Sequence, residues 1–261
     1  MYRIISAIGL FLICAFSLPA QQMKLFDKLL YVNKGDTLTY RLLKPVSPES
    51  KELFPLIIFL HGAGERGKDN ESHIQHISDF VTDPKHRGKY PCFVLAPQCP
   101  KKQMWADFDG SGANVSLSEH PTKPMQLLIE LLARITKEFP IDESRIYVTG
   151  LSMGGYGTWD IIARFPDKFA AAVPICGGGA PETAGRIKHI PVWAFHGALD
   201  RVVVPRESRK MIMALQQAGA TPGYTEYPDI EHNSWVHAYR DPHLVHWLFK
   251  QKLGTTTSDA K

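Results

Sequence analysis

The chain has 261 residues, of which 44% are hydrophobic and 21% are charged. This composition excludes a disordered chain and is typical of one large domain with a full hydrophobic core. The formal net charge is +4. The basic residues are scattered, and the densest groups, at 85–89 and 101–102, are interpreted as solvated loops. A nucleic-acid partner is therefore excluded.

Residues 1–20 have the pattern of a secretory signal peptide. Arg3 precedes a short apolar stretch, and small residues follow it. We expect cleavage near Ala20, because the stretch is shorter than the roughly 20 residues of a membrane-spanning helix. Lipidation at Cys14 is a second interpretation, disfavoured by the bulky Ile13 before it. The sequence thus predicts a protein exported to the periplasm or the medium, without stable insertion in a membrane.

Strand-like and helix-like segments alternate along residues 21–253, which we interpret as a single domain followed by a flexible tail at 254–261. Residues 31–44 predict two strands around a turn at Asn33–Asp36. Later apolar runs fit strands that are buried on both faces. These runs are 55–61, 92–97, 145–150, 169–176, 191–197 and 223–228. Helices are predicted at 123–139, 154–165, 205–219 and 241–252. This order predicts an α/β fold in which helices flank a mostly parallel central sheet, preceded by an antiparallel hairpin.

A serine stands where one of these strands turns into a helix. The segment Gly150-Leu151-Ser152-Met153-Gly154 matches G-x-S-x-G, with a predicted strand before it and a predicted helix after it. This is the context of a nucleophile elbow, in which a strained backbone lifts the serine hydroxyl clear of the sheet. The helix N-terminus also favours developing negative charge. A glycine-rich turn with a helix-capping serine is the alternative interpretation.

A serine nucleophile needs a base, and the chain supplies an acid and a base in the expected order. Asp200 follows the predicted strand 191–197, and His232 follows the predicted strand 223–228. Right-handed crossovers place both on the same rim of the sheet as Ser152. Asp200 would fix the tautomer of the imidazole and stabilise its charged form. The sequence therefore predicts a triad of these three residues.

Other acids and histidines near these positions are expected to have lesser roles. Asp229 and Glu231 adjoin His232 in the sequence, so they are not expected to approach its imidazole from the far side. His196 stands at a strand end and is expected to be packed or hydrogen-bonded there. His61 precedes a glycine turn and is expected to order that loop.

The segment LHGAGERG at 60–67 follows the first central strand. Gly62 and Gly64 would let the backbone approach a substrate closely. A serine nucleophile also needs N–H donors for the oxyanion of its intermediate. One donor is expected from Met153, the residue after the serine, and the other from Ala63.

Four side chains near these segments have open roles. Trp105 is interpreted as a pocket wall, or else as an anchor of its long loop. Trp235 either lines the pocket or packs the loop of His232. Glu65 and Arg66 are candidates for a salt bridge that ties the loop at 60–67 down.

Three cysteines follow the signal peptide, at Cys92, Cys99 and Cys176. The first two flank one strand and are therefore out of disulfide reach of each other. Cys99 and Cys176 both follow predicted strands, so either they pair or all three remain buried thiols. None lies on a turn like that of Ser152, so a cysteine nucleophile is not expected.

No metal and no cofactor are expected. His73 and His76 form an i, i+3 pair on a possible helix, as do His243 and His246. No carboxylate stands with either pair in a ligand motif, so solvated helix faces are favoured over a metal site.

Taken together, several segments resemble α/β-hydrolase serine esterases. They are LHGAGERG, FVLAPQCP, YVTGLSMGGYGTWDIIARFPDKFAAAVPICGGG, FHGALDRVVVP and EHNSW. The resemblance covers residues 30–250 and is greatest to the secreted bacterial carboxylesterase and dienelactone-hydrolase-like group, related to the prolyl oligopeptidase catalytic domain and to feruloyl esterases. It implies Ser152 as nucleophile, Asp200 as acid and His232 as base. Dienelactone hydrolases carry cysteine at the elbow, so Ser152 fits ordinary ester hydrolysis better.

The expected activity is hydrolysis of short-acyl or aromatic, feruloyl-type esters through an acyl-enzyme. The alternative is a serine aminopeptidase or oligopeptidase, which would need an acidic anchor for the substrate amino group; Glu65 or Asp107 could serve. The 261 residues leave no room for the propeller domain of prolyl oligopeptidases. A non-enzymatic binding module on the same fold is a third hypothesis, disfavoured by the complete set of expected site residues.

Overall fold

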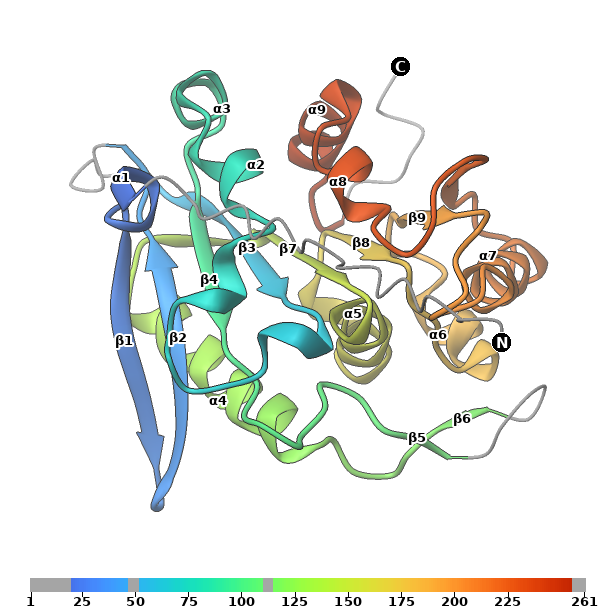
Figure 1. Cartoon of the computed structure of the whole chain (residues 1–261), viewed down its shortest axis with the longest axis horizontal. Coiled ribbons are helices and arrows are strands. Elements are labelled where there is room, and N and C mark those ends of the chain that lie inside the picture. Colours follow the sequence, from blue (N-terminus) through green and yellow to red (C-terminus); the bar gives the residue numbers. More distant parts are fainter. Residues whose placement is uncertain (1–19, 47–51, 110–114, 255–261) are drawn as a thin grey trace, which may run out of the picture.

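An eight-stranded sheet forms the centre of the computed structural model, which describes residues 20–46, 52–109 and 115–254 (Figure 1). The strand order is β1-β2-β4-β3-β7-β8-β9-β10. The strands span Phe26–Asn33 (β1), Asp36–Leu43 (β2), Phe54–Leu60 (β3), Phe93–Pro97 (β4), Ile141–Leu151 (β7), Ala171–Ile175 (β8), Trp193–Gly197 (β9) and Gly223–Tyr227 (β10). β1 and β2 pair antiparallel, as do β2 and β4, and the remaining neighbours pair parallel.

Helices cover both faces of this sheet. The longer ones are Lys123–Glu138 (α4), Met153–Arg164 (α5), Arg206–Gln217 (α7) and Pro242–Lys250 (α9). The shorter ones are Ala20–Met23 (α1), Ser78–Thr82 (α2), Pro84–Lys89 (α3), Ala184–Ile187 (α6) and Trp235–Ala238 (α8). Single 3₁₀ turns lie at Ala63–Glu65 (η1), Ser72–Ile74 (η2), Pro166–Lys168 (η3) and Pro181–Thr183 (η4). A two-stranded hairpin, Phe108–Asp109 (β5) and Ser116–Leu117 (β6), extends away from the sheet (Figure 1).

The alternation of side chains along the strands divides the core into two clusters. Leu56 and Ile58 of β3 belong to the cluster that includes α4, α5, α6 and α7. Ile57 and Phe59 belong to the cluster on the opposite face, which includes α2, α8 and α9. Both sets of residues are buried, so the sheet lies between two layers of helices and the prediction from continuous apolar runs is confirmed.

Each predicted strand is present, with differences at the ends. The first hairpin strand begins at Phe26 rather than at 31, and β7 begins at Ile141 rather than at 145. The turn of the hairpin contains Lys34 at φ 48° and Gly35 at φ 89°. The short helices α2, α3 and α8 and the β5–β6 hairpin were not predicted, because segments this short carry little periodicity.

The expected leader and tail lie almost wholly outside the described residues, which begin at Ala20 and end at Gly254. Among the helices of the described part, none is long and apolar enough to cross a membrane.

Candidate active site

Ser152 sits on a strained corner between β7 and α5. Its backbone has φ 53° and ψ −117°, in a region that non-glycine residues rarely adopt and that costs about 1–3 kcal/mol. A Cβ on Gly154 would lie 1.8 Å from the carbonyl oxygen of Leu60, and one on Gly150 would lie 2.3 Å from that of Gly154. Only glycine therefore lets the two backbones cross, and this crossing holds the serine on its corner.

The structure brings Ser152, His232 and Asp200 together from three separate loops. The serine Oγ lies 2.9 Å from Nε2 of His232, and Nδ1 of the same ring lies 2.7 Å from Oδ2 of Asp200. The carboxylate only accepts, so Nδ1–H donates to it and Nε2 is left to accept the serine proton. The Asp200 side chain is fully buried, and that of His232 is 21% exposed. This arrangement can activate the hydroxyl as a nucleophile.

Two further donors hold the other oxygen of Asp200. Oδ1 accepts the backbone N–H groups of Val202, at 2.9 Å, and Val203, at 3.0 Å. The alternative acids of the sequence, Asp229 and Glu231, are exposed. Asp200 thus orders its own loop in the manner of an aspartate turn while it also holds the imidazole.

The loop after β3 lies against the elbow, as expected for oxyanion donors. A Cβ on Gly62 would lie 2.9 Å from the side chain of Leu151, which precedes Ser152. The N–H groups of Ala63 and Met153 make no hydrogen bond to another described residue. Met153 is the first residue of α5, whose N-terminal N–H groups point away from the helix. Both donors that the sequence predicts are therefore available beside the serine.

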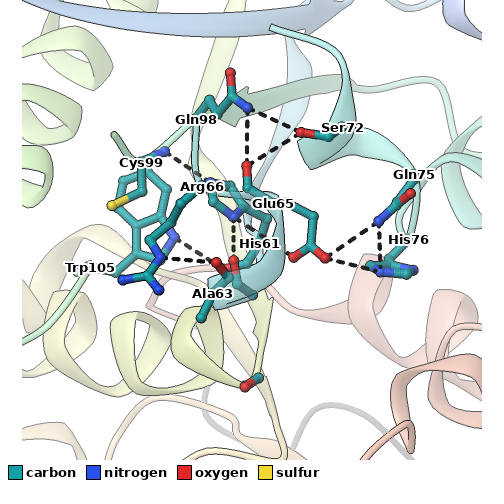
Figure 2. Close-up of polar contacts among 12 residues, drawn as sticks. His61, Ala63, Glu65, Arg66, Ser72, Gln75, His76, Gln98, Cys99 and Trp105 are labelled. Carbon is teal, nitrogen blue, oxygen red and sulfur yellow. Dashed lines mark hydrogen bonds and ion pairs between the residues drawn. The ribbon is translucent and has the colours of Figure 1, made fainter. Parts of the chain in front are cut away.

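A buried polar network holds this loop in place (Figure 2). Nε2 of His61 accepts the N–H of Cys99 at 2.9 Å, so the ring proton sits on Nδ1, which donates to the carbonyl oxygen of Gly62 at 2.6 Å. Burial lowers the pKa of His61 to about 4. The expectation that this histidine orders the glycine turn agrees with these contacts.

Glu65 and Arg66 tie the loop down through different partners rather than to each other. Oε1 of Glu65 lies 3.5 Å from Nε2 of His76, and Nε of Arg66 donates to the carbonyl oxygen of Ala63 at 2.9 Å (Figure 2). Gln98 reaches the carbonyl oxygen of Glu65 at 3.0 Å. The segment is thus fastened at several points between β3 and β4.

Of the two interpretations of Trp105, the pocket wall is wrong, and the structure agrees with an anchor of its loop. The side chain is fully buried, and its Nε1–H donates to the carbonyl oxygen of His61 at 3.1 Å. Its Cβ would meet a Cβ on Gly157 of α5 at 2.6 Å. The indole therefore fills the space between the loop after β3 and α5, because its large apolar surface gains more from this burial than from the solvent.

Trp235 packs against the histidine loop. Its ring lies edge-on to His232, with 5.4 Å between ring centroids, and 5.3 Å from that of His76. The residue is half-buried. Because His76 also reaches Glu65, a continuous set of contacts runs from the loop after β3 to the proposed base. This role of His76 was not predictable from the sequence, since no local pattern relates it to residue 235.

The three described cysteines are buried and free, so no bond joins Cys99 to Cys176. Burial raises the pKa of each thiol to about 12, which argues against a thiolate nucleophile. Sγ of Cys176 lies within 4.8 Å of ligand atoms of Asp200 and His232. Nδ1 of His232 and Oδ2 of Asp200 are hydrogen-bonded to each other at 2.7 Å. The histidine pairs 73/76 and 243/246 are not part of this group.

Residues 44–242 match the model of the phospholipase/carboxylesterase family. The chain belongs to this family. It is 22% identical over 250 residues to a probable carboxylesterase of Arabidopsis thaliana, a match covering 90% of this chain and 92% of that protein. The matched range includes Ser152, Asp200 and His232.

Solved structures give the same fold. A thermostable esterase superposes with a TM-score of 0.79 at 38% identity, over 89% of this chain and 64% of that one. A ferulic acid esterase superposes with a TM-score of 0.66 at 17% identity, over 86% and 98% of the two chains, a likeness that shows the fold alone. An uncharacterised secreted protein of Arthroderma benhamiae is 26% identical over 233 residues. The chain spans 24% of that protein.

Proposed function

We propose that this family member is a serine carboxylic-ester hydrolase that works through an acyl-enzyme. The carrying observation is the relay in which Oγ of Ser152 lies 2.9 Å from His232, whose other nitrogen lies 2.7 Å from Asp200. Both distances are those of hydrogen bonds, so the serine proton has an acceptor and the resulting imidazolium has a counter-charge.

In the first half-reaction, Oγ of Ser152 bonds to the carbonyl carbon of the ester while its proton passes to Nε2 of His232. The oxyanion accepts hydrogen bonds from the N–H groups of Ala63 and Met153. The bond from carbon to the alcohol oxygen then breaks, and His232 returns the proton to that oxygen. The alcohol leaves, and the acyl group remains on the serine.

In the second half-reaction, water gives a proton to Nε2 of His232 as its oxygen bonds to the acyl carbon. The bond to Oγ breaks, the proton returns to the serine, and the carboxylic acid leaves. Throughout, Asp200 keeps the imidazole in the tautomer that presents a bare Nε2 to the serine and to water.

The substrate proposed is a short-acyl or aromatic ester. Leu199, Val202 and Val204 in the loop of Asp200 are 51%, 73% and 44% exposed, an apolar surface beside the acid. The ring of Phe108 in the β5–β6 hairpin lies tilted against that of Tyr156, four residues after the serine, with 6.1 Å between the ring centroids. Such surfaces favour an apolar or aromatic ester group.

The peptidase alternative gains little from the candidate anchors. Glu65 has a side chain only 12% exposed and is paired with His76, and Asp107 is exposed but in no arrangement that selects an ammonium group. We also propose that the chain is exported, on the signal-peptide pattern of residues 1–20.

The test is hydrolysis of p-nitrophenyl esters from acetate to palmitate, methyl ferulate and aminoacyl p-nitroanilides. Ser152→Ala is expected to lower kcat by about 10⁶-fold, and Ser116→Ala, at an exposed serine of β6, is expected to leave it unchanged. Mass spectrometry of the quenched reaction should find the acyl group on Ser152. Turnover retained by Ser152→Ala would overturn the mechanism, and anilide turnover with weak ester turnover would make the chain a peptidase.

A further inference from the structure

A second imidazole lies against the acid of the proposed triad. His196 is the penultimate residue of β9 and is fully buried. Its Nε2 lies 3.2 Å from Oδ2 of Asp200, the same oxygen that contacts His232. The two imidazoles therefore reach one carboxylate oxygen from the sheet and from the histidine loop.

The neighbours of His196 fix where its proton lies. Nε2 faces the carbonyl oxygen of Val203 at 2.8 Å as well as the carboxylate of Asp200. Neither oxygen has a proton to give, so Nε2 carries the ring proton. It hydrogen-bonds to the carbonyl oxygen of Val203, and its N–H lies beside the carboxylate of Asp200. Nδ1 lies 2.7 Å from Oγ of Ser208. That hydroxyl also lies 2.8 Å from the carbonyl oxygen of Gly177, so it has two acceptors for its one proton.

We propose that His196 is a positioning residue of the triad, which aims the carboxylate of Asp200 at His232. This proposal rests on the proposed function for its kinetic consequence. Two backbone N–H groups donate to Oδ1 of Asp200, and the His232 imidazole donates to Oδ2. Nε2 of His196 lies 3.2 Å from that same Oδ2. The backbone donors alone fix one oxygen and leave the carboxylate plane free to tilt. The buried His196 fixes the second oxygen.

The anchoring of His196 explains why it can serve this role. It is held on β9 by the sheet, and Ser208 of α7 and Gly177 after β8 hold its far side. The loop between His196 and Asp200 is in turn fastened to the histidine loop, because Leu199 N–H donates to the carbonyl oxygen of Ile230 at 3.0 Å. The position of the Asp200 carboxylate is thus set by a side chain on the rigid sheet, while the Asp200 loop is hydrogen-bonded to the loop that carries His232.

Two amide substitutions of His196 test the contacts of its two ring nitrogens separately. His196→Gln places an N–H donor near the position of Nε2, toward Asp200, whereas His196→Asn places one near Nδ1, toward Ser208. We expect His196→Asn to lower kcat by about 10- to 100-fold with KM within twofold, as misaligned reacting groups do. His196→Gln should recover most of this loss. Ser208→Ala removes one anchor of the ring but leaves the Nε2 side intact, so it should have the smaller effect, within about threefold of the parent.

A spectroscopic measurement tests the geometry without turnover. The low-field proton resonance of the His232 Nδ1–H that is bonded to Asp200 should move in His196→Asn and stay in place in Ser208→Ala. Equal losses of kcat in the Asn and Gln variants, in step with equal losses of thermal stability and with an unmoved resonance, would overturn the proposal and leave His196 as a packing residue. If the parent enzyme hydrolyses no ester, the proposed function fails, and the resonance alone decides the role of His196.

Discussion

Two loops beside the candidate site begin alike and end differently. Each starts with a buried histidine at the end of a strand and carries a carboxylate four residues later: His61 with Glu65, and His196 with Asp200. In the second pair the imidazole lies 3.2 Å from the acid, but in the first the separation is 4.0 Å. The sequence spacing between histidine and acid is the same in both loops, so the groups around each imidazole must decide whether it contacts its acid.

The neighbours differ in what they offer each ring. Nε2 of His61 meets the N–H of Cys99 and must accept, so its proton on Nδ1 goes to the carbonyl oxygen of Gly62. Nε2 of His196 meets only acceptors and must donate. The two rings are thus opposite tautomers: His61 carries its proton on Nδ1, and His196 carries its proton on Nε2. Glu65, without a donor from His61 at close range, pairs with His76, and the first loop becomes a scaffold while the second holds the acid.

The largest effect is expected from breaking the second loop at Gly197. A Cβ there would lie 2.2 Å and 2.3 Å from the carbonyl oxygens of Glu231 and Ile230, which are backbone atoms of the histidine loop and have little room to move. Gly197→Ala should therefore lower the free energy of unfolding by about 3 kcal/mol or more, measured by urea denaturation. Gly64→Ala in the first loop meets nothing within 4 Å and is the control. A Gly197→Ala protein as stable as Gly64→Ala would show that the loops are not locked together.

The pH dependence of the free energy of unfolding should show that the buried His61 of the first loop is uncharged in the folded protein. The pKa of His61 is lowered by burial from 6.5 to about 4, so below pH 6.5 the unfolded chain takes up a proton that the folded chain refuses. The stability from this histidine is complete above pH 6.5 and is lost as the pH falls to about 4, a loss of about 3 kcal/mol.

Denaturation curves between pH 7 and pH 4 measure this loss. His61→Gln should flatten the dependence by about this amount, whereas His120→Gln, at a side chain that is 84% exposed, should not change it. An unaltered slope in His61→Gln would contradict the placement of an uncharged ring between β3 and β4.

A smaller effect is expected from Glu65→Gln. Burial by itself raises the pKa of Glu65, but the hydrogen bond and charge of His76 outweigh it, and the pKa lies below its ordinary value of 4.5. The carboxylate therefore stabilises the fold above pH 4.5, and this contribution disappears as the pH falls below that value. Glu65→Gln should cost about 1 kcal/mol at pH 7 and progressively less toward pH 3, by the same denaturation assay. A constant difference across this range would mean that its ion pair with His76 contributes nothing.

Much of the site was predictable because its signals are local. The strand, the glycines and the helix around Ser152 identify the corner within a few residues, since only small residues let a strand and a helix cross at that distance. The order of Asp200 and His232 after successive parallel strands placed both on one rim. These inferences need only chain direction and the handedness of crossovers.

The sequence by itself determined the α/β-hydrolase fold, the elbow serine and the order of its partners, since periodicity and turn chemistry are properties of neighbouring residues. The tertiary structure alone decided that Trp105 is buried, that His76 bridges Glu65 and Trp235, and that His61 and His196 have opposite tautomers. These outcomes depend on which donor or acceptor the folded chain brings to within 3 Å of each side chain. For His61 that group is an N–H after β4, and for His196 it is a carbonyl of its own loop, a difference that no spacing along the chain records.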